Sequence, residues 1–175
     1  MNYFHNKTIW ITGASSGIGE ALAIELSKLD ANLILTARRK EELERVKKAC
    51  GNKKVEIFPC DLEQIKEIDD LSHKVQSEFP EIDILINNAG VSAWSSVVET
   101  DYEVYERVMK LNYLSIVKLT KSILPNMIKR KSGQIVTNTS LLGILAIKNR
   151  SVYAASKHAM HGFMNVLRAE MYEHN

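Results

Sequence analysis

The stretch "TIWITGASSGIGEAL", residues 8–22, joins an apolar run of β type to a glycine-rich turn and then to a segment with helical spacing. Gly13 permits a tight turn, Gly17 lets the backbone approach a ligand, and Gly19 lets the helix pack closely against the strand. The N-terminus of that helix offers free N–H groups and the positive end of its dipole, which suit a diphosphate. The stretch therefore predicts a dinucleotide site, although its spacing is G-x3-G-x-G rather than G-x-G-x-x-G.

The rest of the chain alternates in the same way. Longer segments with helical spacing separate the short runs rich in β-branched residues, and the later runs are apolar on both faces. These further runs are residues 32–36, 55–58, 82–86 and 134–138. The alternation predicts a doubly wound α/β fold, Rossmann-like, with a parallel sheet covered by helices on both sides. At 175 residues the chain is expected to be a single domain, residues 1–175.

Local signals place several helix boundaries. Thr100 and Glu103 form a capping-box pattern, so we expect a helix to open near Asp101. Pro125 is expected to kink the long helix that follows. The last helix begins near Ser151 and no strand comes after it, which indicates a doubly wound sheet whose C-terminal strands are missing.

Composition excludes several classes of function. The chain is 45% hydrophobic and 25% charged, as in ordinary globular proteins, and its net charge of +2 is too small to favour nucleic acid. No apolar run approaches the roughly 18–20 residues that span a bilayer, and the N-terminus lacks a signal-peptide core. We therefore expect a cytoplasmic protein without a membrane anchor. Cys50 and Cys60 follow neither disulfide nor metal spacing, which predicts buried reduced thiols, and we expect no metal site.

The end of the second strand bears on the choice of cofactor. A carboxylate there would accept from a free ribose 2′-hydroxyl, whereas an arginine would receive a 2′-phosphate. The sequence reads "LTARRK", residues 35–40, with Arg38 and Arg39 and no carboxylate. These arginines could instead be the solvated start of a helix, but the helix dipole disfavours cations at that end. The planar guanidinium suits phosphate, so the sequence favours NADP.

A second group of residues points to proton transfer. In "SVYAASKHAM", residues 151–160, Tyr153 and Lys157 lie four apart and are neighbours on one helix face. The lysine ammonium stabilises the phenolate, which makes the tyrosine a proton donor and acceptor. Such a pair often arises by chance. Ser140 follows the fifth strand and "NNAG", residues 87–90, follows the fourth, so all are expected at the carboxyl edge of the sheet.

Together these stretches resemble the short-chain dehydrogenase/reductase family. In chain order the matching stretches are "TGASSGIG" (12–19), "CDL" (60–62), "NNAG" (87–90), "LNY" (111–113), "TNTS" (137–140) and "YAASK" (153–157). The segments "ARRKEELERVKKAC" (37–50) and "LPNMIKRKSGQIV" (124–136) are similar to the dehydrogenase/reductase member 7 branch of that family. Members of that branch often carry an N-terminal membrane anchor, which is not expected in this chain.

The resemblance assigns roles to the residues that carry it. It implies that Ser140 positions a carbonyl, Tyr153 transfers the proton, Lys157 also binds the nicotinamide ribose, and Asn112 supports a water in the proton relay. With the two arginines, the expected cofactor-binding residues are Thr12, Gly13, Ser15, Ser16, Gly17, Ile18, Gly19, Arg38, Arg39, Asp61, Leu62, Asn88, Ala89, Gly90 and Lys157.

The main hypothesis is an NADP(H)-dependent carbonyl reductase or alcohol dehydrogenase. The apolar run at residues 141–147 either lines a pocket for a lipophilic small molecule or simply packs under its loop. The alternatives are a truncated dinucleotide-binding or dimerising protein without turnover, and a fragment of a longer reductase. Family members usually run to about 250 residues in one domain. The resemblance also implies a homo-oligomer, either a dimer or a tetramer.

Overall fold

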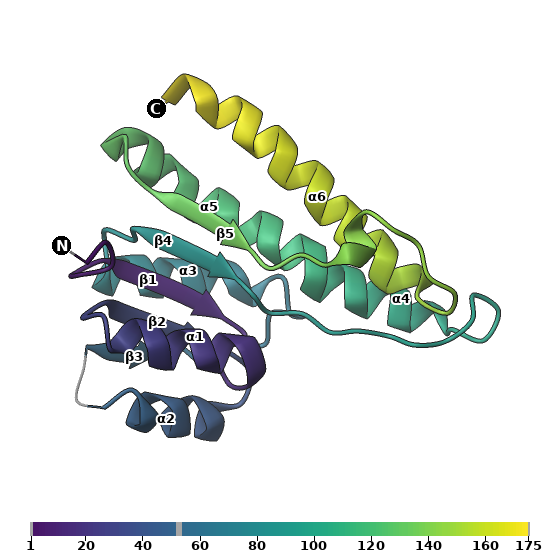
Figure 1. Ribbon diagram of the computed structural model, residues 1–175, viewed down its shortest axis with the longest axis horizontal. Coiled ribbons are helices and arrows are strands. Elements are labelled where there is room, and N and C mark those ends of the chain that lie inside the picture. The colour runs from purple at the N-terminus through teal and green to yellow at the C-terminus, as the bar shows by residue number, and fades with distance from the viewer. Residues whose placement is uncertain (1, 52–53, 175) are drawn as a thin grey trace.

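A five-stranded parallel sheet forms the centre of the structure, a computed structural model that describes residues 2–51 and 54–174 (Figure 1). Positions 1, 52, 53 and 175 lie outside the described residues. The strand order is β3-β2-β1-β4-β5, so the chain moves outward from β1 and then crosses back to β4. This confirms the doubly wound α/β prediction. The strands are β1 (Thr8–Thr12), β2 (Asn32–Thr36), β3 (Val55–Ile57), β4 (Ile84–Asn87) and β5 (Gln134–Thr137).

The predicted strand boundaries hold for β1 and β2 and shift elsewhere. β3 and β5 each end one residue earlier than predicted, and β4 begins at Ile84 rather than at Ile82. Asp83 directly precedes β4 and is already bonded to the neighbouring strands. Its N–H donates to the Thr8 carbonyl at 2.9 Å, and its carbonyl accepts from the Gln134 N–H at 2.8 Å. Its carboxylate also accepts from the Thr8 backbone N–H at 2.9 Å and from Lys7 Nζ at 3.1 Å, at the entry to β1.

Helices cover both faces of the sheet. Their bounds are α1 (Gly17–Ser27), α2 (Lys40–Ala49), α3 (Glu67–Glu78), α4 (Tyr102–Met109), the π-helix η1 (Lys110–Leu114), α5 (Ser115–Arg130), the 3-10 turn η2 (Leu141–Gly143), α6 (Ser151–Met171) and η3 (Tyr172–His174). The last long helix starts at Ser151, as predicted. It begins beside α4 and runs back along the β5 side of the molecule (Figure 1).

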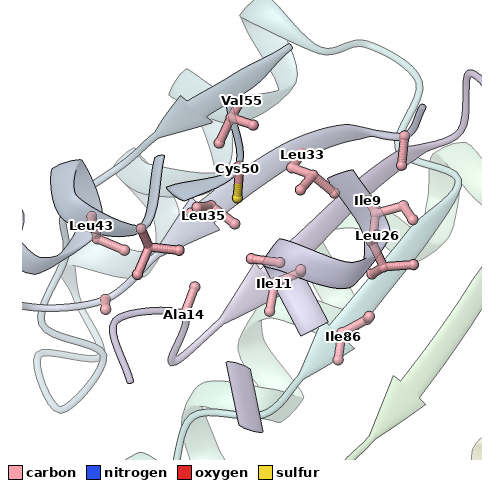
Figure 2. Packing of buried hydrophobic residues seen from close by; sticks show 14 of the residues in the cluster. Ile9, Ile11, Ala14, Leu26, Leu33, Leu35, Leu43, Cys50, Val55 and Ile86 are labelled. Carbon is pink, nitrogen blue, oxygen red and sulfur yellow. The ribbon is translucent and has the colours of Figure 1, made fainter. Parts of the chain in front are cut away.

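Two apolar cores lie on opposite faces of the sheet. One places α1 and α2 against β1, β2 and β4, and Figure 2 shows Leu26 of α1 beside Ile9 of β1. The other places α3 and α5 against the opposite face of the same strands. There the fully buried Trp10 donates its indole N–H to Thr36 Oγ1 at 2.9 Å. Because β1 and β2 are covered on both faces, the turn that follows β1 begins from a buried strand.

The segment before α5 departs from the local prediction. α4 begins after Asp101, as expected, but the capping box is wrong. No described side chain caps α4, and the Thr100 hydroxyl instead donates to the Ser96 carbonyl at 2.6 Å. Thr100 lies one residue too early to cap, so its hydroxyl satisfies the preceding turn. α5 runs through Pro125, and the expected kink there stays a prediction.

Two further sequence expectations concern thiols and membranes. Cys50 is buried and Cys60 half-buried, and both are free thiols in the described chain. The prediction of full burial is therefore wrong for Cys60, which lies at the edge of a cavity. Of the helices in the described chain, none has both the length and the apolar character needed to cross a bilayer.

Candidate active site

A cavity of about 570 Å³ opens at the carboxyl edge of the sheet. Its volume lies within the ordinary range for small-molecule and cofactor sites. It brings together most of the predicted site residues, although they come from segments far apart in the sequence. The predicted residues that line it are Gly13, Ser15, Ser16, Ile18, Arg38, Arg39, Asp61, Leu62, Asn88, Ala89, Gly90, Tyr153 and Lys157.

Five predicted residues are missing from that lining among the described residues: Thr12, Gly17, Gly19, Asn112 and Ser140. Each lies directly behind or beside the lining. Thr12, Gly19 and Asn112 are buried, while Gly17 is exposed at the start of α1.

The glycine turn has the geometry that the sequence predicts. Gly13 and Gly17 have φ values of +65° and +59°, which L side chains rarely adopt. A Cβ at Gly19 would lie 2.3 Å from the Gly13 carbonyl oxygen, so only glycine allows α1 to approach this closely. A Cβ at Gly17 would meet no described atom within 4 Å. The backbone there faces open space at a helix N-terminus, where a diphosphate fits.

A hydrogen-bond network fixes this turn to the end of β4. Thr12 Oγ1 accepts from the backbone N–H groups of Asn88 at 3.0 Å and Ala89 at 3.1 Å. The Asn88 side chain donates back to the carbonyls of Thr12 at 3.1 Å and Gly13 at 3.3 Å. Thr12 and Asn88 thus support this edge of the cavity from behind. The motifs at residues 12–19 and 87–90 are therefore joined as one rigid unit.

The opposite end of the cavity carries both arginines. Arg38 is exposed, and its guanidinium lies 3.7 Å from the Asp61 carboxylate. Arg39 is also exposed and precedes the first turn of α2. Cys60 lines the same end, where burial, reinforced by the charges of Glu67 and Asp61, raises the pKa of its thiol to about 11. The thiol is therefore protonated at neutral pH. The charged side chains that line this end are two arginines and the carboxylates of Asp61 and Glu63.

Tyr153 and Lys157 face the cavity from the first turns of α6. Lys157 is only 5% exposed, and burial lowers the pKa of its ammonium. Its Nζ lies 5.7 Å from the centroid of the Tyr153 ring and donates to the Asn138 carbonyl at 2.9 Å. The predicted neighbourhood of the two side chains is confirmed. A buried cation beside a phenol is suited to proton exchange with a bound oxygen.

Asn112 sits in the π-helix η1 and supports this pair from behind. Its side chain accepts from the Val91 N–H at 2.9 Å and donates to the Val91 carbonyl at 2.9 Å. It also donates to Ser156 Oγ at 3.1 Å, and Ser156 donates to the Tyr153 carbonyl at 2.8 Å. Asn112 therefore links the segment after β4 to the helix that carries Tyr153.

Ser140 lies beside the cavity at the start of η2. Its Oγ accepts from the Leu142 backbone N–H at 3.2 Å. A hydroxyl has one proton and two lone pairs, so this contact leaves its proton free to donate. The apolar run that follows is exposed, with Leu141 at 73% and Ile144 at 67%, and neither side chain lines the cavity.

The polar residues of the site that the sequence reasoning misses include Asn138 and Arg150. Asn138 donates to Asn88 Oδ1 at 3.1 Å and accepts from Lys157, so it connects β4 to α6. Its place in "TNTS" was the available signal. Arg150 contacts residues 92–94 and the Tyr153 ring, and no local pattern distinguishes it from a surface cation.

Comparison with known proteins gives a consistent result. The family model described as short chain dehydrogenase matches residues 7–175. The chain is 49% identical over 172 residues to dehydrogenase/reductase SDR family member 7 from Homo sapiens. That alignment covers 95% of this chain and 51% of the relative. The chain thus spans about half the length of the curated relatives it matches.

Solved structures show the same fold with a bound dinucleotide. A metagenomic short-chain oxidoreductase in complex with NADP has a TM-score of 0.93 at 29% identity, covering 98% of this chain and 79% of that one. A short chain dehydrogenase/reductase from Burkholderia phymatum in complex with NAD also has a TM-score of 0.93, at 25% identity. It covers 100% of this chain and 63% of that one. Both dinucleotides thus occur among structures similar to this chain.

Proposed function

The chain belongs to the short-chain dehydrogenase family, and on that premise we propose an NADP(H)-dependent oxidoreductase that acts on carbonyl compounds or secondary alcohols. One observation carries the proposal. The glycine turn, the arginines after β2 and the Tyr153–Lys157 pair all line one continuous cavity. Binding and proton-transfer groups therefore converge on the same space.

The cofactor would supply or accept a hydride at the nicotinamide carbon. The chain's own residues then have separate tasks. The glycine turn and the start of α1 hold the diphosphate, and Lys157 holds the nicotinamide ribose while stabilising charge on the phenol. Tyr153 gives its proton to the substrate oxygen during reduction and takes it back during oxidation. Ser140 donates a hydrogen bond to the same oxygen as negative charge develops there, and keeps its proton.

The preference for NADP rests on Arg38 and Arg39. Both line the cavity at the end away from Tyr153, where a ribose 2′-phosphate would lie. Asp61 opposes this preference, because its carboxylate already pairs with Arg38 at 3.7 Å. Arg38 is exposed and the pair is long, so a doubly charged phosphate competes successfully for the guanidinium.

A lipophilic substrate is the further part of the proposal. Exposed apolar side chains follow Ser140, and the exposed Trp94 lies on the segment after β4, where it contacts Arg150 beside the Tyr153 ring. Isolated apolar residues at a surface are ordinary, but this group borders the catalytic hydroxyls. A substrate with an alkyl or aromatic body beside its carbonyl would cover these side chains.

The proposal is tested with NADPH titration and with reduction of a panel of aliphatic and aromatic aldehydes and ketones. Tyr153→Phe should lower turnover by about 100- to 10,000-fold, because only the proton donor is lost. Its NADPH dissociation constant should stay within about twofold of wild type, since the ring remains in place. Tyr102→Phe is the matched control, because Tyr102 is 74% exposed and this substitution removes a hydroxyl that lies away from the cavity.

A second candidate function is dinucleotide binding without turnover. It is favoured by the position of Ser140 outside the cavity lining formed by described residues. The same experiment separates the two candidates. NADPH binding without reduction of any carbonyl in the panel would support the binding protein and overturn the reductase.

A further inference from the structure

Arg150 joins the two walls on the substrate side of the cavity. Its guanidinium carbon lies 4.0 Å from the centroid of the Trp94 ring and 6.0 Å from that of Tyr153. Its Nη1 donates to Ser92 Oγ and to the Ala93 carbonyl, the latter at 3.1 Å. One half-buried side chain thus contacts three consecutive residues after β4 and faces the catalytic phenol.

The segment that Arg150 holds, residues 91–95, forms part of the cavity wall through Val91 and Ser92. Asn112 fixes one end of it by bonding both backbone groups of Val91. At the other end the Ser95 N–H donates to the Asn149 carbonyl at 3.1 Å, in a bridge where Ser95 pairs with Arg150. Between these two ends, the side chain of Arg150 connects the segment to the start of α6 through its contacts with Ser92, Ala93 and Trp94.

We propose that Arg150 is a positioning residue that holds the segment 91–95 against the start of α6 and so fixes the substrate-side wall relative to Tyr153. This inference rests on the proposed function, because it requires Tyr153 to exchange a proton with a substrate in that space. Small displacements of a reacting group cost large factors in rate, so the distance between this wall and the phenol matters for turnover.

The chemistry of arginine suits this task. A guanidinium stacks on an indole face and still directs planar N–H donors at neighbouring oxygens. An ammonium can replace the charge and one donor but not the planar stack. Arg150→Lys should therefore retain only part of the turnover that Arg150→Ala loses. Arg150 precedes α6, and among the described residues its side chain makes no capping bond, so its removal leaves the helix start intact.

The experiment compares Arg150→Ala, Arg150→Lys and the control Lys148→Ala, which removes an exposed cation two residues earlier. Amide hydrogen exchange supplies an internal reference within the segment. The Ser95 N–H is bonded at the end that Arg150 holds, whereas the Val91 N–H is bonded to the Asn112 side chain. In Arg150→Ala we expect Ser95 to exchange at least about tenfold faster while Val91 stays protected. Turnover should fall about 10- to 100-fold with the NADPH dissociation constant unchanged.

Arg150→Lys should restore about half of the lost turnover on a logarithmic scale, and Lys148→Ala should match wild type. Unchanged Ser95 exchange in Arg150→Ala would overturn the proposal, as would faster exchange with wild-type turnover. A wild-type protein that binds NADPH but reduces no carbonyl would instead overturn the proposed function. The Ser95 exchange rate would then still decide whether Arg150 holds the segment.

Discussion

Strands β2 and β5 belong to the same sheet but are covered very differently. Leu33, Ile34 and Leu35 of β2 are fully buried, with neighbouring strands on both edges and helices on both faces. In β5 the side chains alternate between exposed and half-buried, and Val136 is 41% exposed. Within the described residues, β5 has a strand partner on its β4 edge alone. The β1–β2 side of the molecule, which carries the proposed cofactor-binding residues, therefore has a closed core, whereas the β5–α6 side is open.

The open side also contains a second cavity. It measures about 290 Å³ and lies where α5, β5 and the end of α6 meet, lined in part by Met127, Ile135, Met164 and Leu167. The proposed catalytic groups lie on this less covered side, because Ser140 follows β5 and Tyr153 lies on α6. The residues proposed to bind the cofactor therefore follow buried strands, whereas the residues proposed to transfer the proton lie on elements that are less tightly packed.

The largest expected effect is on stability. Leu35→Ala in β2 should lower the free energy of unfolding by about 2–5 kcal/mol, because it leaves a cavity in a fully packed core. Val136→Ala in β5 should cost about 0.5 kcal/mol, since this residue is already 41% exposed and its truncation leaves no enclosed cavity. Urea denaturation of both variants measures the difference. Equal losses would show that the two strands are equally supported and would break the comparison.

A smaller effect is expected on the preference between NADPH and NADH, which we assign to Arg38 after the buried strand β2. Arg38→Asp should shift the ratio of NADPH to NADH dissociation constants toward NADH by about 10- to 100-fold, or about 1.5–3 kcal/mol. The replacement removes a charge-assisted contact and adds repulsion against the 2′-phosphate. Fluorescence titration with each cofactor measures the ratio.

Arg168→Asp is the control for charge, since Arg168 lies in the last turn of α6 and lines the second cavity. It should leave the ratio unchanged. An equal shift in both variants would mean that overall charge, rather than a contact of Arg38, sets the preference.

The smallest expected effect is the response of stability to pH, and it has opposite signs at the two ends of the site. The pKa of Cys60 is raised to about 11 in the folded state, so its contribution to stability is present below about pH 8.5 and is lost as pH rises toward 11. The pKa of Lys157 is lowered by burial, so its charged form opposes folding at neutral pH. That opposition is relieved as pH rises from the lowered folded pKa toward the unfolded value of about 10.4.

Urea unfolding between pH 7 and 10 measures both contributions as differences from wild type. The Cys60→Ser variant should lose less stability than wild type as pH rises. The Lys157→Met variant should lack the relief that wild type gains over the same range. Differences of the same sign for the two variants would contradict the assigned environments.

The sequence is most informative where the packing is closed. The boundaries of β1 and β2 and the roles of Gly13 and Gly19 follow from local rules, because buried strands and positive φ angles leave few alternatives. The neighbourhood of Tyr153 and Lys157 follows from helix geometry. The strand order then brings the glycine turn and this pair together at one edge of the sheet.

Local rules fail where a side chain finds a partner that the local pattern does not specify. The Thr100 hydroxyl bonds the Ser96 carbonyl, four residues earlier, instead of capping α4. The position of Ser140 outside the cavity lining depends on the turn at η2, which no periodicity predicts. Arg150 carries no signal at all, since its partners come from residues 92–94.

Amide hydrogen exchange with and without NADPH tests most directly whether the closed and the open side form one site. The account predicts that NADPH slows exchange both at residues 13–19, around the start of α1, and in the first turns of α6 around Tyr153 and Lys157. Exchange in the last turns of α6, residues 164–171, should not change. Protection confined to residues 13–19 would contradict the account, because the catalytic pair would then stand apart from the bound cofactor.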